Sequence, residues 1–132
     1  MRFLIVEDEV ISRTILKGTH SPHGECVVAV DGNAALAAAD AALIRGRPFD
    51  IITMDIRMPN LAGVESLKKI REMERRRQVA ARDAAKVVMA TSVADMKTVF
   101  PAHHDGSCQA HVLKPHDAHV LLEKLREVGL PA

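Results

Sequence analysis

Near its start the chain reads Phe3-Leu4-Ile5-Val6-Glu7-Asp8, four apolar residues followed directly by two acids. The same form returns later in Ile51-Ile52-Thr53-Met54-Asp55. Continuous apolar runs of this length are typical of strands that are buried on both faces of a parallel sheet. Because the carboxyl ends of parallel strands lie along one edge of the sheet, we expect the acids that close these two runs to lie close together.

Apolar runs alternate with helical patterns along the whole chain. Strands are expected at residues 3–6, 26–30, 49–54, 86–90 and 109–113. Helices are expected at residues 10–20 and 34–44, from Pro59 through the charged run at 71–77, at 93–103, and after Pro115. This order predicts an α/β fold, a parallel sheet with helices on both faces. Right-handed crossovers leave few topologies for five β–α units, and the order 2-1-3-4-5 is one of them.

Composition narrows the class of protein. The length of 132 residues suits one domain spanning residues 1–132. A net charge of +1 and 2% aromatic residues argue against nucleic acid or an anionic membrane as partner. No apolar run approaches the ~20 residues of a membrane-spanning helix. The two cysteines form no disulfide framework, so a reduced, cytoplasmic compartment is expected.

A hydroxyl and an ammonium group are expected to join the acids. Thr91 follows the fourth expected strand and Lys114 follows the fifth. Two carboxylates ~4 Å apart repel by about 4 kcal/mol at an effective dielectric constant near 20, so such a group either raises a pKa or binds a cation. Few, hard oxygen ligands on a rigid edge favour Mg²⁺, which keeps water ligands that a phosphate can replace. The sequence therefore predicts a site for a divalent cation and a phosphoryl group.

These residues resemble the receiver domain of bacterial two-component response regulators. Five pieces carry the resemblance, each at the end of an expected strand, and together they extend over nearly the whole chain. They are Glu7-Asp8-Glu9, Asp31-Gly32, Asp55-Ile56-Arg57-Met58-Pro59 with Gly63, Thr91, and Lys114-Pro115. The resemblance implies a flavodoxin-like (βα)5 fold, doubly wound, with a five-stranded parallel sheet in the order 2-1-3-4-5.

The resemblance also implies a role for each site residue. Asp55 would accept a phosphoryl group from a phosphohistidine of a sensor histidine kinase or phosphotransfer protein. Mg²⁺ would bind to Asp8, to Asp55, to the backbone carbonyl of Arg57 and, through a water molecule, to Glu7. Thr91 and Lys114 would contact the phosphoryl group. The added charge would then bias a two-state rearrangement that switches the binding of a protein partner.

One position departs from the family pattern. His111 stands where receivers often carry Tyr or Phe as a switch residue. Imidazole is smaller, polar and titratable near neutral pH. Our hypothesis is that His111 still rotates inward when Thr91 is drawn to the phosphoryl group. The alternative is a histidine on an edge strand that faces solvent.

We expect a stand-alone switch rather than an enzyme, as a monomer or weak homodimer. Its output would be a protein contact near the fourth helix, the fifth strand and the fifth helix. Alternatives are a receiver that is part of a larger response regulator and an interaction module that is not phosphorylated. A phosphatase with an aspartyl-phosphate intermediate is disfavoured, because Arg57 occupies the position two residues after Asp55 where such enzymes carry a general acid. The charged run at residues 71–77 is interpreted as a solvated helix face.

Overall fold

The computed structural model of the chain describes residues 1–58, 61–97, 101, 107–114 and 118–131. The strands are β1 (Arg2–Val6), β2 (Glu25–Ala29), β3 (Ile51–Asp55), β4 (Lys86–Thr91) and β5 (Ala110–Leu113). The described α-helices are α1 (Val10–His20), α2 (Gly32–Ile44), α3 (Gly63–Arg76) and α5 (Ala118–Glu127). Short 3-10 turns are η1 (Ser21–His23), η2 (Ala81–Asp83) and η3 (Val93–Asp95).

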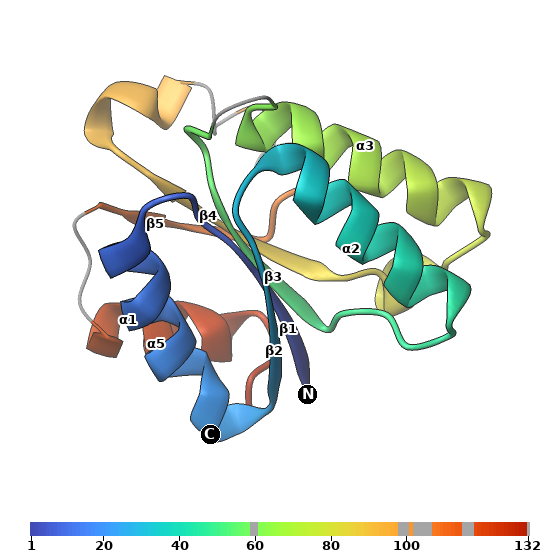
Figure 1. The fold of residues 1–132 in the computed structure, drawn as a ribbon, viewed down its shortest axis with the longest axis horizontal. Helices are drawn as coiled ribbons and strands as arrows, with labels where there is room; N and C mark the ends of the chain where they lie inside the picture. Colours follow the sequence, from blue (N-terminus) through green and yellow to red (C-terminus); the bar gives the residue numbers. More distant parts are fainter. Residues whose placement is uncertain (59–60, 98–100, 102–106, 115–117, 132) are drawn as a thin grey trace.

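The sheet has five parallel strands in the order β2-β1-β3-β4-β5, which confirms the predicted topology. Helices α2 and α3 cover one face and α1 and α5 cover the other (Figure 1). The strand order changes direction at β1, so β1 and β3 are adjacent at the centre of the sheet. Their carboxyl ends therefore lie side by side.

Alternation along β1 explains why its whole apolar run is buried. Leu4 and Val6 belong to the core under α2 and α3, whereas Phe3 and Ile5 belong to the core under α1 and α5. All four side chains are fully buried. A strand that packs helices against both faces needs apolar residues at every position, which is the pattern that the sequence carries.

One polar contact crosses the core between α1 and β3. The imidazole of His20 is fully buried, with Nδ1 2.6 Å from the carbonyl oxygen of Leu16 and Nε2 2.8 Å from Oγ1 of Thr53. A carbonyl oxygen can only accept, so Nδ1 donates to Leu16, and Nε2 pairs with the Thr53 hydroxyl. Thr53 lies two residues before Asp55, and this bond ties α1 to the strand that carries the expected phosphoacceptor.

Helix α3 begins later than the sequence predicted. Helix α3 starts at Gly63, not at Pro59, and Pro59 itself lies outside the described residues. The backbone of Gly63 packs on the exit of β3, where its N–H donates to the carbonyl of Ile56 over 2.9 Å. A Cβ atom there would lie 2.8 Å from Cα of Ile56 and closer still to the carbonyl of Asp55, so only glycine fits. Helix α5 is described from Ala118, after Pro115 as the sequence predicted, and residues 115–117 lie outside the described residues.

The expected helix at residues 93–103 begins as the 3-10 turn η3, and most of its remainder lies outside the described residues.

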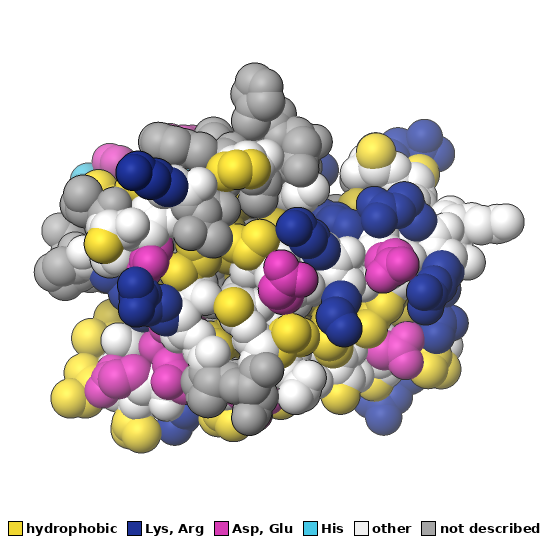
Figure 2. Space-filling view, turned by 90° about the horizontal axis from the view of Figure 1, so that it is seen from above, with side chains coloured by type: hydrophobic (Ala, Val, Ile, Leu, Met, Phe, Trp, Pro, Cys, Tyr) yellow, Lys and Arg dark blue, Asp and Glu magenta, His cyan; other side chains and the backbone are white. Residues whose placement is uncertain are grey.

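Part of α3 also differs from expectation. The charged run at its end was interpreted as a solvated face, but Arg71 and Glu74 are buried against each other, with 2.7 Å between Nη1 and Oε1. The exposed remainder carries cations with acids between them, as Figure 2 shows at the end of the molecule where α3 ends.

Among the described helices, none is both long enough and apolar enough to span a lipid bilayer.

Candidate functional site

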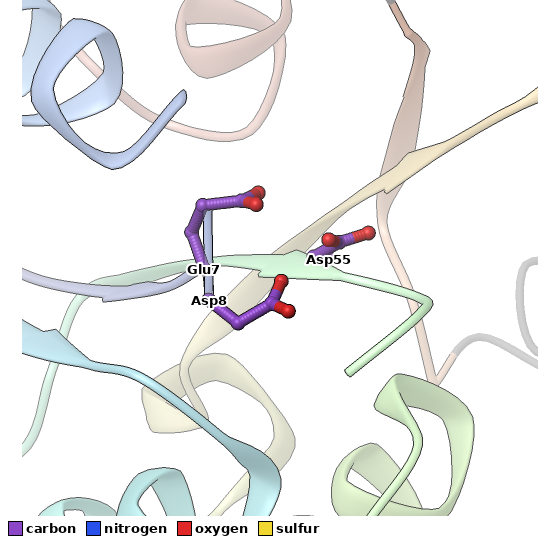
Figure 3. A group of neighbouring side chains, drawn as sticks. All are labelled: Glu7, Asp8 and Asp55. Carbon is purple, nitrogen blue, oxygen red and sulfur yellow. The ribbon is translucent and has the colours of Figure 1, made fainter. Parts of the chain in front are cut away.

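Three carboxylates meet at the carboxyl edge of the sheet, beyond the ends of β1 and β3. We call Glu7, Asp8 and Asp55 the acidic cluster; one carboxylate oxygen from each lies within 4.8 Å of the others. Figure 3 shows their side chains converging from the two neighbouring strands. Glu7 and Asp55 are buried, whereas Asp8 is exposed. The cluster is thus closed on the protein side and open to solvent at Asp8.

Lys114 faces the acidic cluster from the end of β5. Its Nζ lies 3.0 Å from Oε2 of Glu7 and 3.0 Å from Oδ2 of Asp55. Its backbone N–H donates to the carbonyl of Thr91 over 2.7 Å, which fixes the exit of β5 against the end of β4. The positions of the strand ends predicted this ammonium group beside the acids, and the structure places it there.

The buried charges influence one another. Burial raises the pKa of Glu7, and the neighbouring Asp55 carboxylate raises it further, against the lowering effect of Lys114. Burial alone would lower the pKa of Lys114, but hydrogen bonds to Asp55 and Glu7 outweigh it and the pKa is raised. Lys114 therefore stays an ammonium at neutral pH and neutralises only part of the charge of the acidic cluster.

Thr91 lies on β4, the strand beside that of Asp55, and His111 lies on β5, one strand further from it. Thr91 is buried and follows Ala90, the β4 residue in register with Asp55. Its hydroxyl donates to the carbonyl of Ser92 over 3.1 Å. His111 lies on β5 opposite Met89 and is half-buried, so it is neither fully inside nor fully facing solvent. Its proposed inward rotation stays a prediction.

The pairing of Arg57 with Asp95 is a feature that the sequence did not reveal. Arg57 Nε donates to Oδ2 of Asp95 over 2.7 Å, and Nη2 donates to Oδ1 over 2.9 Å. The hydrogen bonds with Arg57 hold the pKa of Asp95 below its usual value, and those with Asp95 raise the pKa of Arg57. The sequence predicted a role for Arg57 through its backbone carbonyl only, and it assigned Asp95 no place at the site. Their separation of 38 positions gave no signal that they meet.

The donors present suit Mg²⁺. Asp8 and Asp55 offer hard carboxylate oxygens on adjacent strands, the set that Mg²⁺ prefers. Both oxygens of Glu7 already have partners, Lys114 Nζ at 3.0 Å and the N–H of Glu9 at 3.3 Å. This agrees with a role for Glu7 through a water molecule. The N–H of Arg57 donates to Oδ1 of Asp55 over 3.2 Å, which keeps the Arg57 backbone beside the acidic cluster.

Comparisons with known proteins agree with this geometry. A family model described as the response regulator receiver domain matches residues 3–126. The chemotaxis protein CheY of Bacillus subtilis (strain 168) is 28% identical over 126 residues, which cover 96% of this chain and 95% of that protein. The structure of CheY4 from Vibrio cholerae superposes with a TM-score of 0.76 at 26% identity, covering 96% of this chain and 97% of that one.

A further similar structure contains two signalling proteins. It is the co-crystal structure of the Saccharomyces cerevisiae histidine phosphotransfer signaling protein Ypd1 and the receiver domain of its downstream response regulator Ssk1. The matched chain superposes with a TM-score of 0.79 at 26% identity, and the match covers 98% of this chain and 88% of that one. The likeness thus extends over nearly the whole of the present chain.

Proposed function

The chain belongs to the response regulator receiver domain family of two-component signalling, and we propose that it is a phosphoacceptor switch whose acceptor is Asp55. One observation carries the proposal: a single ammonium group, Lys114 Nζ, lies 3.0 Å from Oδ2 of Asp55 and 3.0 Å from Oε2 of Glu7, beside a third acid, Asp8. This is an arrangement for holding a divalent cation and a phosphoryl group on one carboxylate.

In the proposed reaction an oxygen of Asp55 attacks the phosphorus atom of a phosphohistidine on a donor protein. The O–P bond forms as the N–P bond breaks, and the histidine nitrogen leaves with the electron pair of that bond. Lys114, already beside Asp55, neutralises charge on the transferring phosphoryl oxygens, and Thr91 donates its hydroxyl to one of them. When bound at Asp8, Asp55 and the Arg57 carbonyl, Mg²⁺ supplies further neutralisation of that charge.

The donor class is a sensor histidine kinase or a phosphotransfer protein, as in the Ypd1 and Ssk1 pair. An exposed apolar surface on the first turns of α1, beside Asp8, supports a protein donor at this edge. Val10 is 62%, Ile11 69% and Ile15 49% exposed. Exposed apolar side chains gathered next to a reactive group are typical of a surface that another protein covers.

The switch would operate through Thr91 and His111. Thr91 exchanges its hydrogen bond to Ser92 for one to the phosphoryl group, and His111 moves into the space beside it. If His111→Ala leaves the structure of the phosphorylated state and its partner affinity unchanged, this part of the proposal is wrong.

Acetyl phosphate with Mg²⁺ tests the acceptor without a partner protein. We expect one adduct, stable in acid and labile in base, that is lost in Asp55→Asn and kept in the matched control Asp40→Asn, a half-buried residue on α2. Intact-protein mass spectrometry measures it. The absence of an adduct in the wild-type chain would favour an interaction module that is not phosphorylated, and rapid multiple-turnover release of phosphate would favour a phosphatase.

A further inference from the structure

A hydrogen-bonded chain links the loop after Asp55 to the turn after β4. The guanidinium group of Arg57 binds both carboxylate oxygens of Asp95, at 2.7 and 2.9 Å. Ser92 Oγ donates to Oδ2 of the same carboxylate over 3.0 Å. The carbonyl of Ser92 accepts the hydroxyl of Thr91 over 3.1 Å. The turn after β4 therefore holds two groups of the proposed site. One is the guanidinium of Arg57, and the other is the hydroxyl of Thr91, which is expected to bind the phosphoryl group.

We propose that Arg57 and Asp95 form a latch: Asp95 holds the Arg57 guanidinium in the unphosphorylated state and yields it to the phosphoryl group when Asp55 is phosphorylated. The inference rests on the proposed function, because it concerns the response of the site to a phosphoryl group on Asp55. In this role Asp95 is a positioning residue that opposes phosphorylation until the phosphoryl group takes its place.

The geometry allows the exchange. The Arg57 side chain is 76% exposed, so it can swing without disturbing the core. Its backbone N–H already donates to Oδ1 of Asp55, so the guanidinium is tethered close to where a phosphoryl group would stand. A guanidinium group binds phosphate as well as carboxylate through two parallel hydrogen bonds. A phosphoryl group carries ≈ −1.5 to −2 charge against −1 on Asp95, and it therefore competes well for the same cation.

Departure of Arg57 would also loosen the turn. Asp95 would lose its bidentate partner and keep the hydroxyl of Ser92, while Thr91 would be drawn from the carbonyl of Ser92 to the phosphoryl group. Both changes act on the same turn, which joins β4 to the residues after η3. By reciprocity, a change that weakens the latch but keeps the Arg57 guanidinium group must strengthen the binding of a phosphoryl group.

Beryllofluoride with Mg²⁺ is the probe, because it imitates a phosphoryl group on an aspartate without being hydrolysed. The chain has no Trp, so the apparent dissociation constant is measured from amide shifts in a two-dimensional NMR titration. The proteins are wild type, Asp95→Asn, Arg57→Gln, the double variant and Asp40→Asn. The last breaks a comparable ion pair with Arg77, 2.9 Å long, on α2 and α3 away from the site.

We expect Asp95→Asn to bind beryllofluoride about fivefold more tightly than wild type, since the probe no longer competes with the latch. In the Arg57→Gln background the same substitution should change affinity less than about twofold, because its effect passes through the guanidinium. Asp40→Asn should bind as wild type. The signal of Arg57 Nε–H should be protected in the metal-free wild-type protein and lose that protection in Asp95→Asn.

Two outcomes overturn the latch alone. In one, Asp95→Asn binds the probe no more tightly than wild type. In the other, Asp95→Asn raises the affinity for beryllofluoride equally in the wild-type and Arg57→Gln backgrounds, which means that Asp95 acts only as a nearby negative charge. Failure of every protein, wild type included, to bind beryllofluoride or take up phosphoryl from acetyl phosphate overturns the proposed function and the latch with it.

Discussion

Two groups of ion pairs with buried carboxylates lie at opposite edges of the same sheet and differ in how fully their charges are matched. At the amino edge, before β4 and β5, every N–H group of Arg71 has an acceptor within 3.0 Å. These acceptors are Glu74, Gln109 and the carbonyls of Ala85 and Ser107. The second oxygen of Glu74 accepts the N–H of Ala85 over 2.9 Å. This network contains one cation, one anion and neutral dipoles.

At the carboxyl edge the balance is different. The ammonium group of Lys114 faces Glu7 and Asp55, and Asp8 completes the acidic cluster. Negative charge is left over, and burial together with the neighbouring Asp55 carboxylate raises the pKa of Glu7. A matched network fixes the position of a helix, whereas an unmatched one retains affinity for a cation. The comparison predicts that changes at the amino edge reduce stability and that changes at the carboxyl edge alter binding.

Arg71→Met should have the largest effect on stability. The substitution keeps much of the aliphatic volume but leaves Glu74 buried without its cation, and removing one partner of a buried ion pair costs about 3–5 kcal/mol. Urea unfolding followed by circular dichroism measures the change. The control is Arg76→Met on the same helix, whose partner Glu72 is 3.5 Å away and whose side chain is 75% exposed. It should cost less than about 1 kcal/mol. Equal losses in the two variants would contradict the contrast between the two edges.

Thr53→Val probes the core between the two edges. Valine keeps the shape of threonine but removes the hydroxyl that lies 2.8 Å from His20 Nε2, so the buried ring loses this hydrogen bond. Such a loss costs about 1–3 kcal/mol. Uptake of phosphoryl from acetyl phosphate by the folded fraction should be kept, since Thr53 lies under the site and not in it. A neutral or stabilising substitution would mean that the His20 contact contributes nothing.

Mg²⁺ should stabilise the protein through the carboxyl edge. A ligand that binds only the folded state at ten times its Kd adds about 1.4 kcal/mol. We expect a concentration-dependent rise in Tm that EDTA reverses and that Asp8→Asn strongly reduces, because Asp8 is an expected direct ligand. Arg76→Met, far from the acidic cluster, should respond as wild type. If the Tm of the wild-type chain does not change with Mg²⁺ concentration, the support for a cation site is removed.

The sequence allowed the sheet and the meeting of the acids to be predicted, because both follow from one regularity. Strands buried on both faces must be continuously apolar, and in a parallel sheet whatever follows them lies at one edge. Glu7, Asp55, Thr91 and Lys114 could thus be placed together without knowledge of any loop. The strand bounds were displaced by only a residue or two, since apolar runs mark the middle of a strand better than its ends.

Other features could not be predicted, because they depend on contacts that no local pattern encodes. Arg71 and Glu74 lie in a charged run that resembles a solvated helix face, and their burial depends on carbonyls from the approach to β4 and β5. Arg57 and Asp95 meet only because two loops turn toward each other. The start of α3 at Gly63 was missed because the close approach to β3, not Pro59, determines it.

The smallest expected effect is a pH dependence that belongs to Glu7. Burial raises the pKa of this carboxyl above the value of 4.5 that it has when unfolded. The folded state then holds a proton that the unfolded state has released, so stability must fall as pH rises. Glu7→Gln is neutral at every pH and removes this dependence. The free energy of unfolding of wild type minus that of Glu7→Gln, measured in EDTA, removes the contributions of the titrating groups that do not interact with Glu7.

We expect that difference to be most favourable to wild type below pH 4.5 and to decline as pH passes through the raised pKa of Glu7. At neutral pH the free energy of unfolding of Glu7→Gln should therefore rise relative to that of wild type, although the variant has lost a charged partner for Lys114. Saturating Mg²⁺ should reduce the decline, because the cation favours the ionised form. A difference that grows with pH in EDTA would show that the Lys114 ammonium lowers the pKa of Glu7 by more than burial and Asp55 raise it. The carboxyl edge would then be as well matched as the amino edge, and its surplus of negative charge could no longer explain an affinity for a cation.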